Sequence, residues 1–369
     1  MTPRPPRPGR VPLMVLATTD PVVRDAATFA MATDDPSLVV LRHDILEDEQ
    51  GGAIRRVVLD ATGVVEDCVV PLEHACLSCA VREDALPVLR ALASHGRWGA
   101  VMLALPVSAE SLPVTRALGW ETGRSGLLRD LRLAHVLAAV DVDTFEDDVL
   151  GDDLLDERGL ALTSDDRRSV GEAVVAQVAH ADTVLVTGDA DAHGVASDLL
   201  DHLRAVDGHR VDGLYEHPPT RFLTGAHDAR CAERRLDPLH AERRRGAVRT
   251  DGDVWTIELR SERPLHPDRL VEHVRRLGEG RLRSRGRFWV PSRPGSVCAW
   301  DGAGGQLSIG VSGEWGRREP DTCLVVTGVG AGQAEVRRAF DDILMTEHEL
   351  RDGLTSWLGR PDVLEPWLG

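Results

Sequence analysis

The sequence predicts an α/β fold in two parts: a mostly parallel sheet with helices on both faces, followed by a small α+β domain. In the first half, continuous runs of Val and Leu alternate with amphipathic helical segments, as in parallel strands that are buried on both faces. A stretch rich in Pro, Gly and Arg then interrupts this alternation. The second half has the order strand–helix, three strands, strand–helix, which indicates an antiparallel sheet with helices on one face.

These changes in pattern divide the 369 residues into five segments. We expect a disordered leader at 1–10, the α/β domain at 11–216, an Arg-rich linker with one short helix at 217–250, the α+β domain at 251–350 and a tail at 351–369. The leader and the apolar run after it imitate a signal peptide, but that run is short and is followed by a helix and a strand at βαβ spacing.

The elements of the first domain follow from the apolar runs and the amphipathic segments between them. Strands are expected at 11–17, 37–42, 99–106, 133–141 and 182–188, a strand pair at 55–72, and helices at 21–33, 82–95 and 169–181.

In the second domain, strands are expected at 253–260, 281–291, 296–302, 305–313 and 321–329, and helices at 266–277 and 334–345. The first of these helices begins with His-Pro-Asp, and proline suits the first turn of a helix.

The composition excludes several classes of protein. The formal net charge is −17, which disfavours binding to nucleic acid through phosphate contacts, although local Arg clusters at 230–249 and 275–287 remain available for partners. No run approaches the roughly 18–20 apolar residues of a membrane span. Six cysteines with one close pair do not form a disulfide framework, so we expect a cytoplasmic, reducing location.

The segment HACLSCAVRED, residues 74–84, carries the strongest chemical signal. Cys76 and Cys79 form a Cys-x-x-Cys pair, and Glu73 and His74 precede it directly. Thiolates with an imidazole suit Zn²⁺, which takes four ligands, so a remote ligand, a water or a second chain would complete the site. Cys68 is the nearest further thiol. We predict His74, Cys76 and Cys79 as zinc ligands, and two alternatives stay open: a redox pair, or two buried structural cysteines.

Two groups of motifs resemble the CobW family of GTP-dependent metallochaperones. In the second domain they are HPDRL, RSRGRFW, AGG and GEW; in the first they are ACLSCAVREDAL, VLAAVDVDTF and AQVAHADTVLV. The resemblance implies a P-loop-GTPase-like first domain and a CobW C-terminal domain, with zinc as the expected metal.

The chain departs from that family at each nucleotide-binding element. All 43 basic residues are arginines, and the sequence contains neither Lys nor Asn, so a P-loop Lys and an Asn-Lys-x-Asp motif are absent. The turn after the first strand has no glycine and carries Asp20, and Arg24 does not substitute for the ammonium of a lysine. In the segment VTGDAD, Thr187 and Gly188 stand where the guanine-specificity motif would have its Asn and Lys. After the strand at 99–106 the family has a carboxylate and a Gly-rich switch, but here the strand end is apolar and the first carboxylate, Glu110, comes late. We therefore expect no GTP binding of the usual kind, and we assign no catalytic or cofactor-binding residues.

Ser78 stands where the family's cysteine motif has its middle thiol. Together with the degenerate P-loop and the second domain, this Cys-x-Ser-Cys motif makes the chain resemble an actinobacterial branch of the family that recruits a ribosome hibernation factor when zinc is scarce. The resemblance implies a non-catalytic adaptor with the ribosome and a hibernation factor as partners, and with no membrane or sequence-specific nucleic acid. The alternative is a zinc metallochaperone that binds and hydrolyses GTP.

The remaining polar and aromatic candidates have simpler explanations. His43 and Asp44, at a strand end, are expected to meet solvent, and Asp141 and Asp143 to cap the turn that follows them. Three tryptophans of the second domain are expected in its core: Trp289, Trp300 and Trp315.

Overall fold

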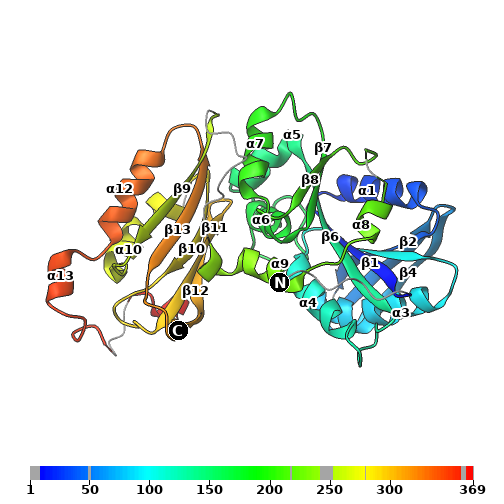
Figure 1. Ribbon diagram of the computed structural model, residues 1–369, viewed down its shortest axis with the longest axis horizontal. Coiled ribbons are helices and arrows are strands. Elements are labelled where there is room, and N and C mark those ends of the chain that lie inside the picture. The colour runs from blue at the N-terminus through cyan, green and yellow to red at the C-terminus, as the bar shows by residue number, and fades with distance from the viewer. Residues whose placement is uncertain are drawn as a thin grey trace.

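The computed structural model describes residues 9–48, 51–216, 218–241, 252–278, 280–358 and 363–368. Within these residues the chain forms an eight-stranded sheet and a five-stranded sheet, which lie side by side (Figure 1). The predicted fold class, a mostly parallel α/β sheet followed by a small α+β domain, is confirmed.

The first sheet has its parallel strands in the middle and at one edge. Its strands are β1 (Val11–Ala17), β2 (Leu38–Asp48), β3 (Gly51–Asp60), β4 (Gly63–Leu72), β5 (Ala100–Ala104), β6 (Leu131–Asp141), β7 (Thr183–Thr187) and β8 (His209–Asp212). They run in the order β4-β3-β2-β5-β1-β6-β7-β8. The pairs from β2 to β8 are parallel, and β3 and β4 add an antiparallel hairpin at the other edge.

Helices cover both faces of this sheet because alternate strand residues point to opposite sides. Leu13 and Val15 of β1 belong to an apolar cluster with α3 (Leu86–Ser94) and α4 (Ser111–Glu121). Met14 belongs to another cluster, with α1 (Pro21–Asp34). The helices α5 (Val142–Leu150), α6 (Val170–His180) and α7 (Gly194–Leu203) pack at the β7 end. The sequence analysis did not predict α4, α5, α7 or β8.

The segment expected to be a linker is more ordered than predicted. It forms α8 (Thr220–Leu223), α9 (Ala229–Leu236) and a 3₁₀ turn (Pro238–His240). Phe222 and Leu223 are buried in the core of the first domain, so this part of the chain is a packed extension of that domain. The prediction of one short helix was wrong because the Pro, Gly and Arg residues hid this apolar pair. Residues 242–250 of the segment lie outside the described part of the chain.

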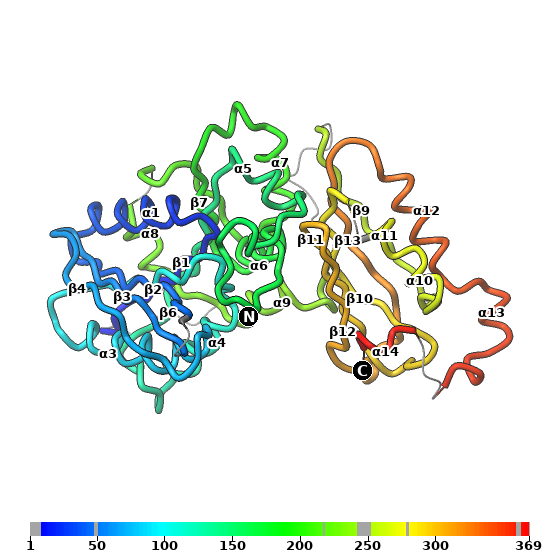
Figure 2. The backbone as a smooth tube through the Cα atoms, turned by 180° about the vertical axis from the view of Figure 1, so that it is seen from behind, coloured from blue at the N-terminus to red at the C-terminus, as the bar shows by residue number. Residues whose placement is uncertain are grey.

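The second sheet is antiparallel throughout. Its strands are β9 (Val254–Ser261), β10 (Leu282–Phe288), β11 (Ser296–Ala303), β12 (Gln306–Glu314) and β13 (Thr322–Val329), in the order β12-β11-β10-β13-β9. Its helices are α10 (Pro267–His273), α11 (Arg275–Gly278) and α12 (Gln333–Ile343). They lie on the face turned away from the first domain (Figures 1 and 2). The helix predicted at 266–277 is divided after His273.

The tail packs back onto this domain. After α13 (Glu347–Arg351), the short helix α14 (Glu365–Leu368) lies beside β12 (Figure 2), and Leu364 and Leu368 are buried. All three predicted core tryptophans of the domain are also buried. None of the described helices is long and apolar enough to cross a bilayer.

The two domains contact each other through polar and apolar groups, since Val254 and Ala303 of the second domain belong to an apolar cluster of the first. Ser169 Oγ donates to the carbonyl of Ala303 at 3.2 Å, and Arg281 forms an ion pair with Glu146 at 2.8 Å. The second sheet thus faces α5, α6 and α7 of the first domain.

Candidate functional site

The cysteine motif lies at the junction between the edge hairpin and α3. After β4 the chain makes a loop, a single turn of helix α2 (Leu77–Cys79) and a π-helix (Ala80–Ala85) that continues into α3. Cys76 caps this helical stretch, because its Sγ accepts a hydrogen bond from the backbone N–H of Cys79 at 3.4 Å. Wider π turns are frequent at functional sites, since they re-aim side chains within a helix.

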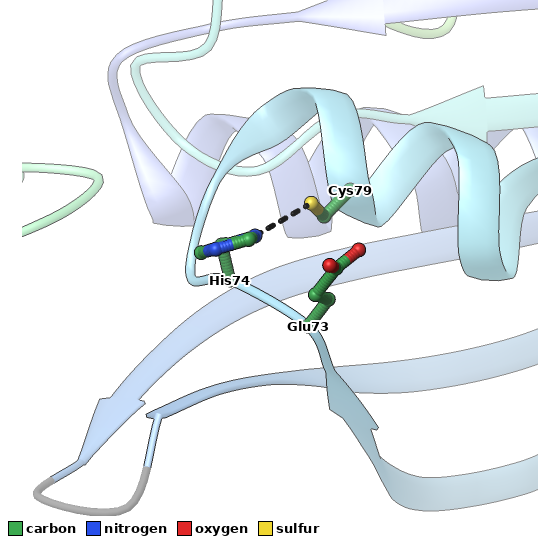
Figure 3. A group of neighbouring side chains, drawn as sticks. All are labelled: Glu73, His74 and Cys79. Carbon is green, nitrogen blue, oxygen red and sulfur yellow. Dashed lines mark hydrogen bonds between the residues drawn. The ribbon is translucent and has the colours of Figure 1, made fainter.

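Three potential metal ligands converge at this junction: Glu73, His74 and Cys79 (Figure 3). One ligand atom from each lies within 4.8 Å of the others. Cys79 Sγ and His74 Nδ1 are 3.8 Å apart. A sulfur and a nitrogen on one tetrahedral zinc ion lie about 3.6 Å apart, given ordinary Zn–S and Zn–N bonds. These two side chains therefore need little movement to share a zinc ion.

Cys76 is the fourth group at the junction. Its thiol is hydrogen-bonded to that of Cys79, and this contact, together with burial and the nearby Glu83 carboxylate, raises the pKa of the Cys79 thiol. Redox chemistry and zinc binding both use the thiolate, so this raised pKa opposes either one. The alternative of two buried structural cysteines fits poorly, because Cys79 is buried while Cys76 is partly exposed.

A charged network holds the loop in place around the sulfur. Arg82 Nη2 lies 3.6 Å from Cys79 Sγ, 3.2 Å from Glu73 Oε2 and 2.7 Å from Glu83 Oε1. The Glu83 carboxylate also accepts the backbone N–H of Glu73 at 3.0 Å. The sequence analysis gave Glu73 no ligand role, although its place next to His74 was the available signal. Cys68 lies elsewhere, on β4, where its thiol donates to Glu66.

Two features behind the loop fix its position. A Cβ at Gly52 of β3 would lie 2.2 Å from the backbone nitrogen of Ala75, so only glycine lets the loop pack this close. In the π-helix, Asp84 is buried, lies 2.8 Å from His43 Nε2 and pairs with Arg56. Burial opposes ionisation of Asp84, but His43 and Arg56 outweigh it and lower its pKa. The expectation that His43 meets solvent was wrong, because it is 2% exposed and faces this carboxylate.

Comparisons with known proteins point to CobW-type proteins and to zinc. The profile of the cobalamin synthesis protein cobW C-terminal domain matches residues 254–344. A Mycobacterium tuberculosis protein named a zinc chaperone is 28% identical over 322 residues, which is 83% of this chain and 74% of the relative. The second domain is a CobW C-terminal domain, and the chain is similar to CobW-type proteins along most of its length.

Two further matches are more distant. A Dictyostelium discoideum protein named zinc-regulated GTPase metalloprotein activator 1 is 24% identical over 277 residues, 69% of this chain and 56% of the relative. The crystal structure of the Zn(II)-bound YjiA GTPase from E. coli aligns with 90% of this chain and 99% of the YjiA chain. The two sequences are 14% identical, and the TM-score is 0.36. The similarity to CobW-type proteins does not rest on that structural match.

In this CobW-type protein the start of α1 is occupied by the chain's own carboxylate. The turn between β1 and α1 consists of three residues, and Asp20 Oδ1 accepts the backbone N–H groups of Val22 at 2.6 Å and Val23 at 3.0 Å. Phosphate binds at helix N-termini through N–H groups of this kind. Arg24 is buried and pairs with Asp44 at 2.6 Å, so its guanidinium is also engaged.

The loop after β7 is held by the aspartates that follow β6. Asp141 accepts the backbone N–H of Asp143, and Asp143 Oδ1 accepts that of Asp189 at 2.9 Å. Gly188 has a φ of 83°, and a Cβ there would lie 2.5 Å from both carboxylates. The prediction that Asp141 and Asp143 cap a turn is confirmed for Asp141, and Asp143 additionally fixes the loop in which the CobW-type resemblance places a guanine-specificity motif.

Proposed function

We propose that this CobW-type protein binds zinc at Glu73, His74 and Cys79, with Cys76 beside them, and acts by zinc-dependent association with other proteins rather than by GTP hydrolysis. The observation that carries the proposal is the convergence of the first three side chains within 4.8 Å. The names of the mycobacterial and Dictyostelium relatives, which both refer to zinc, support the same metal.

The ligand set suits reversible zinc binding. Ser78 is exposed and offers no thiolate, so the motif has two sulfurs at most. The exposed His74 and Glu73 leave one side of the ion open to water or to a ligand from another chain. Such a site gains or loses its metal as zinc availability changes, which is the behaviour required of a sensor.

The nucleotide-binding side of the proposal rests on Asp20. Its carboxylate already accepts two N–H groups at the start of α1, and a phosphate there would meet a negative charge in place of free donors. The sequence supplies no Lys to offset that charge. We therefore propose that this domain keeps the sheet and helices of a GTPase without its usual nucleotide site.

The proposed partners are the ribosome and a hibernation factor in the cytoplasm, by resemblance to the actinobacterial branch described above. We test this with the full chain, by co-sedimentation with ribosomes from zinc-starved and zinc-replete cells. Co-sedimentation that depends on zinc starvation and on the hibernation factor is expected. Equal absence from ribosomes under both conditions would reject these partners without affecting the zinc site.

Zinc binding is tested by titration against a chromogenic chelator. We expect one zinc ion per wild-type chain, and a loss of affinity of roughly tenfold or more in Cys79→Ser and in His74→Ala. Cys68→Ser is the matched control, since that thiol lies outside the cluster, and it should bind zinc like the wild type. Equal affinity of Cys79→Ser and wild type would refute the site.

The alternative function is a zinc metallochaperone that binds and hydrolyses GTP. It is favoured by the name of the Dictyostelium relative, which describes a GTPase metalloprotein activator. The two functions share the zinc site and differ in the nucleotide, so a GTP titration separates them.

A further inference from the structure

A cavity of about 370 Å³ is lined by residues of both domains and by none of the cysteine motif. The first domain contributes residues of α6, the end of α7 with the turn after it (residues 202–207), and Arg235 of α9. The second domain contributes residues of β9, β10 and β13 from the sheet face that carries no helices. Its volume is in the range of small-molecule sites in proteins.

The charged groups that line the cavity are mostly cationic. They comprise the arginines Arg204, Arg235, Arg283 and Arg285 and one carboxylate, Asp207. Three of the arginines have acidic partners: Arg204 pairs with Asp201, Arg235 with Asp182 and Asp207, and Arg283 with Asp301.

Arg285 differs from these three arginines. It donates a hydrogen bond to the carbonyl of Arg235 at 2.6 Å, and it forms no ion pair within the part of the chain that the structure describes. Burial and the neighbouring Arg283 lower the pKa of Arg285 to about 10, although the Asp301 carboxylate, opposite Arg285 on β11, acts the other way. Asp301 is bonded to Arg283, so the two arginines share one carboxylate, and an anion in the cavity would balance the second positive charge.

The other walls suit a molecule larger than a bare anion. Thr256 and Thr327 present hydroxyl groups that are hydrogen-bonded to each other at 2.8 Å, and His202 Nδ1 lies 2.7 Å from the Thr256 hydroxyl. Val175, Ala179 and Leu203 provide an apolar wall on the opposite domain.

A planar guanidinium matches phosphate oxygens, and a phosphate monoester carries nearly two negative charges.

We propose that this cavity binds a small molecule carrying a phosphate group, with Arg285 contacting the phosphate and Arg283, which shares the Asp301 carboxylate with it, alongside. Because both domains line the cavity, the ligand ties the second sheet to the first domain. The proposal does not depend on the zinc site.

Calorimetry of the full chain at constant ionic strength tests the proposal, with inorganic phosphate and pyrophosphate as probes. We expect saturable binding of one anion per chain and a loss of affinity of roughly tenfold or more in Arg285→Met, which keeps the length of the apolar stem. Arg317→Met removes an exposed arginine of the same domain and should bind like the wild type.

A second variant keeps the test valid if Arg285→Met is unstable. Val325→Phe adds bulk to the cavity wall without removing an arginine, and it should also weaken anion binding. Failure of both probes to bind the wild type would overturn the proposal. Binding that Arg285→Met and Val325→Phe leave unchanged would overturn it as well.

Discussion

Single residues decide both halves of the proposed function. Cys79 supplies the buried sulfur of the proposed zinc cluster, and Asp20 occupies the helix end where the proposal has a nucleotide phosphate excluded. On this proposal the sheet and helices stay as they are, and a few side chains change what the domain binds.

Gly52 is predicted to control the zinc site without being a ligand. In Gly52→Ala the new methyl group would lie 2.2 Å from Ala75 N and 2.4 Å from the carbonyl carbon of His74, so the loop must move away from β3. Because His74 moves with the loop, zinc affinity should fall by roughly tenfold. The control is Gly310→Ala on β12, where a Cβ meets nothing within 4 Å. Unchanged zinc affinity in Gly52→Ala would show that the loop tolerates displacement.

Asp20 is predicted to stabilise α1. Asp20→Ala removes a side chain that accepts two backbone N–H groups, and loss of such a cap costs about 1 kcal/mol of the free energy of unfolding. Urea denaturation measures this loss. Asp34→Ala, at the other end of the helix, should cause no loss, since an acidic residue there opposes the helix dipole. An equal effect of the two substitutions would contradict the capping role.

At the scale of elements, the π-helix connects the zinc cluster to the sheet. Asp84 is the residue that connects them, through His43 of β2 and Arg56 of β3. Asp84→Asn leaves Arg56 and His43 without their buried carboxylate, and breaking a buried ion pair costs about 3 kcal/mol or more. We expect that loss in urea denaturation, together with weaker zinc binding.

Asp67→Asn is the control for Asp84→Asn. It removes a carboxylate from an exposed pair with Arg55 on the same hairpin, and pairs of this kind contribute about 1 kcal/mol or less. Equal destabilisation by both variants would show that Asp84 has no special anchoring role.

The elements that the sequence predicted well are those with a strong apolar pattern. The strand pair at 55–72, the helix at 21–33 and the continuous Val and Leu runs of the parallel strands all correspond to observed elements. The helices α5 and α7 were missed although their buried residues follow helical spacing, at 142, 145, 149 and 150 in α5 and at 196, 199 and 200 in α7. The π-helix could not be predicted, since its wider turn depends on contacts of Asp84 with distant strands.

The candidate site was predicted in part for the same reason. His74 and Cys79 are close in sequence and do lie together, whereas the third predicted ligand, Cys76, lies beside the cluster and Glu73 takes its place in it. The contributions of Gly52, His43 and Arg56 come from other strands and follow only from the fold. The interdomain cavity likewise depends on residues that are up to 152 positions apart, from Val175 to Thr327.

At the scale of the whole molecule, a buried histidine cluster joins the segment 218–241 to the first domain. Asp182 pairs with His227 at 2.8 Å and with Arg235 at 3.2 Å, and His180 packs edge-on against His227. His135 contacts the hydroxyl of the neighbouring Thr183. Burial lowers the pKa of His135 to about 4 and that of His180 to about 3. Although burial opposes it, pairing with His227 lowers the pKa of Asp182 to about 2.

Acid is therefore predicted to destabilise the protein in two stages. As the pH falls below about 6.5, the unfolded chain protonates these histidines while the folded chain does not, so stability falls, by roughly 3 kcal/mol per histidine at pH 4. Below about pH 4 the unfolded chain also protonates Asp182 first, which lowers stability further. Urea denaturation of the metal-free chain at several pH values measures this.

The variant His180→Phe tests whether the loss of stability in acid comes from the buried histidine cluster. His180→Phe removes one of the two buried histidines with a lowered pKa, and its stability should depend less steeply on pH between about 6.5 and 4. A slope equal to that of the wild type would place the acid sensitivity elsewhere in the molecule.

The central claim is that this CobW-type protein retains a zinc site without the usual nucleotide site. The most direct measurement is calorimetric titration of magnesium–GTP into the full chain, with and without bound zinc. We predict no saturable binding of GTP in either state, because Asp20 holds the N–H groups at the start of α1 and the chain has no lysine. Binding of one GTP per chain in the micromolar range, with or without zinc, would contradict the claim.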